Sequence, residues 1–220
     1  MARLARAVFA DLPHHITQRG NGRQQTFFCD EDYAFYRELL GEHCRQARVE
    51  VWSYVLMPNH VHLLLVPGDP DGLRRSLAPL HRRYAGRIHQ RERRTGHFWQ
   101  GRFGCVAMDE DHLACAVRYV ALNPVRAGLT GRAVDWPWSS TATLLGLDDD
   151  GVTHTGAVSA RIPDLAALLE TAEDAERTMR LRRAETVGRP IGGADWLAAL
   201  EQASGRALLP GQRGRKRREE

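Results

Sequence analysis

Two histidines in an apolar run are the residues of this sequence best suited to chemistry. Residues 57–65 contain His60 and His62, and Val61, Leu63 and Leu65 alternate with them. The run predicts a buried strand, in which His60 and His62 point to the same face. Two imidazoles at this spacing can reach one divalent cation whose other ligands come from elsewhere in the chain. The alternative is a pair of hydrogen-bonded polar side chains at the rim of a sheet.

A tyrosine and an asparagine one helical turn apart form a second candidate pair. Asp109 is a predicted N-cap for a helix over residues 110–122. Tyr119 and Asn123 are four residues apart and therefore share a face. We expect that face to point away from the apolar stripe of Leu113, Val117 and Val120. A phenol and a carboxamide beside the two histidines would make a metal-assisted nucleophilic site, whereas ordinary packing is the alternative.

The elements that must position these residues follow from periodicity and breaker residues. We expect strands over residues 14–18, 49–56, 60–66 and 97–106, and helices over residues 31–47, 73–94 and 110–122. Asp30 is a predicted N-cap, and Pro79 predicts a kink or a restart of its helix. The polar stretch 148–151 separates a domain over residues 1–147 from a helical C-terminal extension over residues 148–210. Residues 211–220 are predicted to form a disordered basic tail.

Composition limits the classes of function that fit this chain. The 220 residues are 43% hydrophobic and 26% charged, as in ordinary globular proteins. The four cysteines form no CxxC pair, and there is neither a long apolar run nor a signal-peptide core, so we expect a cytoplasmic protein with no membrane segment. Residues 73–132 contain 12 arginines against 4 acidic residues, which suits a phosphate-rich partner. A solvated arginine-rich helix surface would have the same composition.

Five segments in order resemble the single-tyrosine transposases of the HUH class, particularly the REP-associated tyrosine transposase branch. The resemblance covers about residues 10–145, and a weaker likeness to that branch's C-terminal extension covers residues 188–206. The five segments that carry it are HITQRGN (15–21), MPNHVHL (57–63), FWQGRF (98–103), YVALNPVRAGL (119–129) and DWPWSS (135–140).

The resemblance implies an α+β fold, in which helices pack on an antiparallel sheet in a ferredoxin-like (RRM-like) arrangement. It implies a DNA transposase that cuts single-stranded DNA near hairpins with Mg²⁺ or Mn²⁺ and forms a 5′-phosphotyrosine intermediate. By position, His60 and His62 would be metal ligands and Tyr119 the nucleophile. Asn123 would be the third metal ligand, at a place where the insertion-sequence relatives have glutamine.

Arginines near the motifs are the predicted phosphate contacts. They are Arg19, Arg102, Arg118 and Arg126. The basic tail at residues 213–218 is expected either to add non-specific DNA affinity or to occlude the site. The resemblance to the REP-associated branch favours a monomer over a homodimer.

Two other classes of protein remain open. A histidine-triad nucleotide hydrolase also has alternating strand histidines, but its third histidine would fall at Leu64. A catalytically inactive or domesticated protein that binds single-stranded nucleic acid could have the same fold and the same arginines. Convergence of His60, His62 and Tyr119 on one open pocket would favour the enzyme, whereas a tyrosine facing the core would argue against it.

Overall fold

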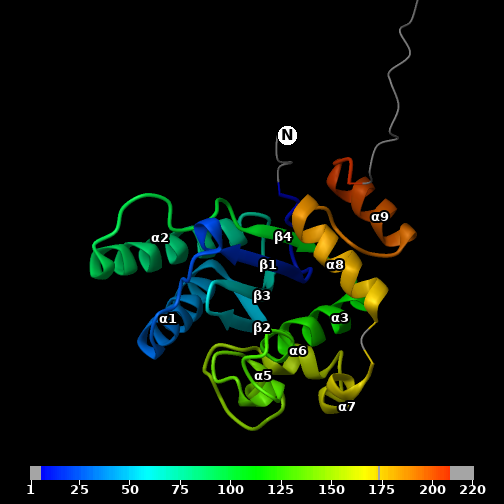
Figure 1. Cartoon of the computed structure of the whole chain (residues 1–220). Helices are drawn as coiled ribbons and strands as arrows, with labels where there is room; N and C mark the ends of the chain where they lie inside the picture. Colours follow the sequence, from blue (N-terminus) through cyan, green and yellow to red (C-terminus); the bar gives the residue numbers. More distant parts are fainter. Residues whose placement is uncertain (1–5, 173, 209–220) are drawn as a thin grey trace, which may run out of the picture.

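A computed structural model describes residues 6–172 and 174–208 and shows one four-stranded sheet with helices on both faces (Figure 1). Every neighbouring pair of strands is antiparallel, and the strand order is β2-β3-β1-β4. The strands are β1 (His14–Arg19), β2 (Val49–Met57), β3 (His60–Pro67) and β4 (Gly104–Ala107).

The first six elements run β1-α1-β2-β3-α2-β4, which is the ferredoxin-like succession and confirms the predicted fold class. The remaining helices are short or belong to the C-terminal extension. The helices are α1 (Asp30–Ala47), α2 (Gly72–Glu92), α3 (Glu110–Ala121), α4 (Asn123–Arg126), α5 (Thr141–Leu144), α6 (Thr155–Ser159), α7 (Leu165–Glu170), α8 (Ala175–Val187) and α9 (Ala194–Ser204), with 3-10 turns η1 (Asn21–Arg23) and η2 (Ala133–Asp135).

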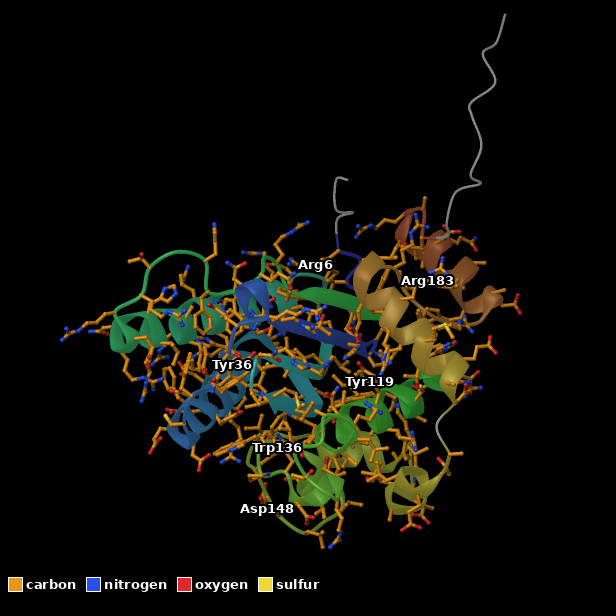
Figure 2. The ribbon with its side chains drawn as sticks, viewed as in Figure 1. Arg6, Tyr36, Tyr119, Trp136, Asp148 and Arg183 are labelled. Carbon is orange, nitrogen blue, oxygen red and sulfur yellow. The ribbon has the colours of Figure 1, made fainter. Side chains whose placement is uncertain are left out.

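The sheet separates two apolar cores because strand side chains alternate between its faces. On one face α1 and α2 pack over Ile16, Leu63 and Leu65, and they enclose an aromatic group centred on Tyr36 and Tyr84. Figure 2 labels Tyr36 beside α1. On the other face α3 packs over Leu64 and Val106. The two histidines of β3 share this second face, so the chemistry lies on the side of the sheet that carries α3.

The C-terminal extension packs on the domain as part of this second core. Asp150 accepts hydrogen bonds from Val152 and Thr153 in a turn, and the following chain pairs with β2 through the His154 amide and the Val51 carbonyl (2.8 Å). Further on, apolar residues of α6, α7 and α8 lie against α3 and the sheet. In Figure 1, α8 lies beside α3 and β4, and α9 lies beyond α8. The predicted basic tail lies outside the described residues.

Three local predictions need correction. Helix α2 continues through Pro79 and ends at Glu92. The predicted strand 97–106 is confined to β4, because the preceding glycine-punctuated loop only touches β1 at isolated points such as the Gln100 amide and the Arg19 carbonyl (2.8 Å). Helix α1 begins at Asp30 itself, with Cys29 at the N-cap position.

No helix within the described residues is both long and apolar enough to cross a membrane.

Candidate active site

Strand pairing brings a third histidine to the predicted pair. In the antiparallel register of β1 and β3, Thr17 lies opposite His62 and Arg19 lies opposite His60. His15 is two residues before Thr17 and therefore points to the same face of the sheet. The sequence motif contained His15, but only the register shows that it meets the histidines of β3.

The three imidazoles form a row, in which His15 and His62 are buried and His60 is half-buried. His15 Nε2 lies 2.9 Å from His62 Nδ1, and the two rings stack with centroids 5.0 Å apart. The His60 ring lies 4.9 Å from that of His62, and its Nδ1 is held by the Asn59 side-chain oxygen at 2.6 Å. Burial lowers the pKa of His15 to about 3 and that of His60 to about 4, and it lowers the pKa of His62 well below its usual value. The imidazoles are therefore neutral near pH 7, as metal ligands must be.

Tyr119 projects from α3 onto this row. Its ring lies edge-on to His62 at 5.4 Å and to His15 at 5.9 Å. Its opposite side is covered by two guanidinium groups, with Arg126 at 4.4 Å and Arg182 at 5.6 Å from the ring centroid. The structure thus brings Tyr119 together with His15 and His62, and the role of each in the reaction stays a prediction.

The surroundings of Tyr119 differ from the predicted open face. Only 7% of the residue is exposed, and it belongs to the same apolar cluster as Leu113 and Val117. The ring is covered by the histidines of the sheet and by Arg126, and also by Arg182 of α8, which packs beside α3. Burial and the charge of Glu185 raise the pKa of the Tyr119 phenol, and Arg182 and Arg126 oppose the rise.

Helix α8 adds two residues, Arg182 and Glu185, that the sequence pattern did not reveal. Glu185 Oε1 lies 3.4 Å from His15 Nδ1 and 4.0 Å from His62 Nδ1. Burial raises the pKa of this carboxyl group to about 7, although Arg19 and Arg182 pull it down. Both residues come from a stretch with no recognisable motif, so no local signal could have identified them.

A polar pocket opens beside the histidine row. Two of the four predicted phosphate-contacting arginines, Arg19 and Arg102, line it together with His60 and Glu185. Gln18 and Gln100 add neutral polar groups, while Arg6 and Arg23 extend the positive charge. The pocket therefore has the charge and hydrogen-bonding groups that suit a phosphodiester chain next to the buried site.

The other predicted site residues lie elsewhere. Arg126 contacts the nucleophile candidate itself, because it covers the Tyr119 ring and donates to the Tyr119 carbonyl. Arg118 donates to the carbonyl groups of Leu168 and Thr171, so it ties α3 to the end of α7. Asn123 begins α4 and is 9% exposed. Its predicted role as a metal ligand stays a prediction.

Comparison with known protein families identifies the family of this chain. Residues 9–123, slightly more than half of the chain, match the model of the family described as "Transposase IS200 like". The chain belongs to this family. The matched region contains His15, His60, His62 and Tyr119 and ends at Asn123, whereas α8 lies beyond it.

Two known proteins are similar to this chain, one in sequence and one in fold. A protein of Haemophilus influenzae that carries the name of a REP-associated tyrosine transposase is 27% identical over 117 residues, which cover 48% of this chain and 66% of that protein. A solved structure of a REP-associated tyrosine transposase bound to a REP hairpin superposes with a TM-score of 0.58 at 22% identity, covering 68% of this chain and 90% of that one. The structural likeness shows that the fold is shared.

Proposed function

We propose that this protein cleaves and rejoins single-stranded DNA near hairpins through a covalent bond between Tyr119 and a 5′ phosphate. The observation that carries the proposal is the contact of the Tyr119 ring with His15 and His62 beside an arginine-lined pocket. The solved relative is bound to a REP hairpin, which supports hairpin DNA as the substrate class.

In the proposed reaction the Tyr119 phenolic oxygen attacks phosphorus and the bond to the 3′ oxygen breaks. The phenol loses a proton and the departing 3′ oxygen gains one, so atoms and charge balance. The phosphodiester is conserved in the phosphotyrosine, which lets a 3′ hydroxyl reverse the step without a nucleotide cofactor. Arg126 and Arg182 lie over the ring, where they favour negative charge on the phenol oxygen. Arg19 and Arg102 are placed to hold flanking phosphates.

The residues of the site fit a divalent cation, for which we propose Mg²⁺ or Mn²⁺. The imidazoles of His15 and His62 are buried, that of His60 is half-buried, and the lowered pKa values keep all three neutral. His15 Nδ1 is enclosed without a hydrogen-bond partner among the residues that the structure describes. His60 and His62 are the ligands that the sequence motif predicts, with Asn123 as the predicted third ligand. A bound ion would supply positive charge at the scissile phosphate and orient it.

The site also supports the monomer as the active unit. His15, His62 and Tyr119 meet within one chain, so no second copy is needed to assemble them. We therefore expect cleavage activity in the fraction that elutes as a monomer from a sizing column.

One observation favours a second candidate function. Tyr119 is 7% exposed and Arg182 lies over it, so the scissile phosphate has to displace that side chain before attack. If the Arg182 side chain is never displaced from Tyr119, the protein would bind single-stranded nucleic acid without cutting it.

A covalent-adduct assay distinguishes the DNA-cleaving enzyme from the protein that only binds nucleic acid. The full-length protein is incubated with hairpin-bearing single-stranded DNA and Mn²⁺ and analysed on a denaturing gel. We expect a protein–DNA adduct that disappears in Tyr119→Phe and persists in Tyr33→Phe, a matched control because Tyr33 is also 7% exposed but packs between Phe27 and Trp138 in the other core. Intact binding with no adduct over a broad set of hairpins would establish the binding protein instead.

A further inference from the structure

Helix α8 reaches the histidine row from a part of the chain that the family match does not include. Its Glu185 lies in the last turn of the helix and lines the polar pocket. The side chain is 18% exposed, yet its Oε1 atom is enclosed and faces the histidines. A carboxylate in this position needs a compensating partner.

The atoms around Glu185 are spaced like ligands of one ion. Potential ligand atoms of His15, His62 and Glu185 all lie within 4.8 Å of one another, and they form the one such group among the described residues. Nitrogen and oxygen ligands bind metals at about 2.1 Å, so neighbouring ligand atoms of one ion lie about 3.0 to 3.4 Å apart. The observed 3.4 Å between His15 Nδ1 and Glu185 Oε1 matches that range, whereas the 2.9 Å contact with His62 is made by the other ring nitrogen of His15, Nε2. The 4.0 Å between Glu185 and His62 matches two ligands at a wider angle.

The hydrogen bonding of the group is incomplete in a way that an ion would explain. His15 Nδ1 and Glu185 Oε1 are both enclosed and both lack a hydrogen-bond partner within residues 6–172 and 174–208, although they face each other at 3.4 Å. Buried polar atoms are rarely left unsatisfied, because an unpaired buried donor or acceptor loses the hydrogen bonds that it makes with water in the unfolded chain. Two such atoms directed at the same point indicate a ligand that contacts both.

We propose that Glu185 is a protein ligand of the divalent cation, together with His15 and His62, so that the C-terminal extension completes the metal site. The inference rests on the proposed function and deepens it, because it assigns to α8 the oxygen ligand that the sequence motif assigned to Asn123. Two imidazoles and a carboxylate form a mixed nitrogen and oxygen set that suits Mn²⁺, while the open pocket side leaves positions for water and phosphate oxygens.

The proposed metal site combines residues of the family-matched region with a residue of the C-terminal extension. Tyr119 and the histidines lie within the matched region, but the Glu185 carboxylate joins them only when α8 packs beside α3 and β4. Arg182 is one turn before Glu185 on the same helix and covers Tyr119. One helix thus supplies both the proposed metal ligand and a guanidinium group at the nucleophile.

Binding of Mn²⁺ alone to the full-length protein, measured by titration calorimetry, tests the inference without relying on activity. Loss of a neighbour that only supports a ligand weakens metal binding about 10- to 100-fold, so loss of a ligand is expected to weaken it about 100-fold or more. We expect that loss in Glu185→Ala and in His62→Ala. Glu176→Ala is the matched control, because Glu176 is an exposed glutamate in the first turn of α8 and its loss leaves affinity unchanged.

The outcomes separate this inference from the proposed function. Unchanged affinity in a folded Glu185→Ala, with affinity lost in His62→Ala, overturns the inference and leaves the histidine metal site standing. Absence of Mn²⁺ binding by the wild-type chain overturns the inference and also the proposed divalent cation site. The adduct assay without metal then tests whether Tyr119 still forms a covalent bond with DNA.

A measurement on the wild-type chain covers the case in which Glu185→Ala does not fold. Mg²⁺, which is diamagnetic, is added to protein labelled with ¹³C at the glutamate carboxyl carbons. We expect the NMR signal of the Glu185 carboxyl carbon to shift on metal binding, while that of Glu176 stays in place. An unmoved Glu185 signal, with shifted imidazole signals of His15 and His62, would overturn the assignment of Glu185.

Discussion

Asp109 joins the helix that carries the tyrosine to the C-terminal extension, so its removal is a quantitative test of how the site is held together. Its Oδ1 accepts hydrogen bonds from the His112 amide (3.0 Å) and from His112 Nδ1 (2.6 Å), and its Oδ2 accepts one from the Gly193 amide (2.8 Å). The first bond caps α3 and is worth about 1 kcal/mol. The other two contribute about 1 kcal/mol each. Asp109→Ala is therefore expected to lower the free energy of unfolding by about 3 kcal/mol.

Thermal and urea unfolding followed by circular dichroism measure this loss. For a chain of this length about 3 kcal/mol corresponds to a melting temperature lower by about 6–12 °C. Asp109→Asn keeps an oxygen acceptor and is expected to lose only about 1 kcal/mol. Asp111→Ala is the matched control in the same helical turn, since that residue is exposed and contributes only the interaction with the helix dipole, about 0.5 kcal/mol. A loss below about 1 kcal/mol in Asp109→Ala would refute the reasoning.

The same carboxylate predicts a pH dependence. Burial would raise the pKa of Asp109, but the hydrogen bonds from His112 and Gly193 outweigh it and hold the pKa below the usual value. Because the folded pKa lies below the unfolded pKa of about 3.9, the stabilisation is fully present above about pH 4 and is lost as the pH falls through the folded pKa. The stability difference between wild type and Asp109→Ala is therefore expected to shrink below pH 4 in urea unfolding curves. A difference that stays constant down to pH 2 would contradict this assignment.

Two pairs of substitutions test the pocket and its surroundings. In Gly104→Ala a Cβ atom would lie 2.4 Å from Thr17 Oγ1, so we expect about 1–3 kcal/mol of destabilisation, whereas Gly86→Ala has open space in mid-helix and is expected to gain up to about 1 kcal/mol in urea unfolding. Equal effects of the two changes would show that the crowding at Gly104 is unimportant. Arg102→Ala is expected to weaken single-stranded DNA binding and to lower the slope of log affinity against log salt by about 0.7. Arg118→Ala is expected to leave that slope unchanged, because its guanidinium group bonds to backbone carbonyls at α7, and a reduced slope there would restore Arg118 as a phosphate contact.

Patterns of residues close together in the sequence were sufficient to predict which elements carry His60, His62 and Tyr119. Alternation along residues 60–66 placed His60 and His62 on one face, and the structure has them there. The Asp109 cap and the helical spacing after it located Tyr119 within α3. The resemblance of the ordered motifs to a known family implied the ferredoxin-like sheet, and the strands expected from the local patterns are compatible with it. These features depend on neighbours close in sequence, which is why one sequence could show them.

Only the tertiary structure decided what surrounds Tyr119 and which groups meet the histidines. His15 joins them because the register of β1 against β3 aligns the faces of two strands far apart in the chain. Glu185 and Arg182 join because apolar residues of α8 find their burial against α3. Periodicity records which side of an element is apolar but not which partner covers it, since hydrophobic burial has no direction of its own. The partner is determined by the packing of the whole chain.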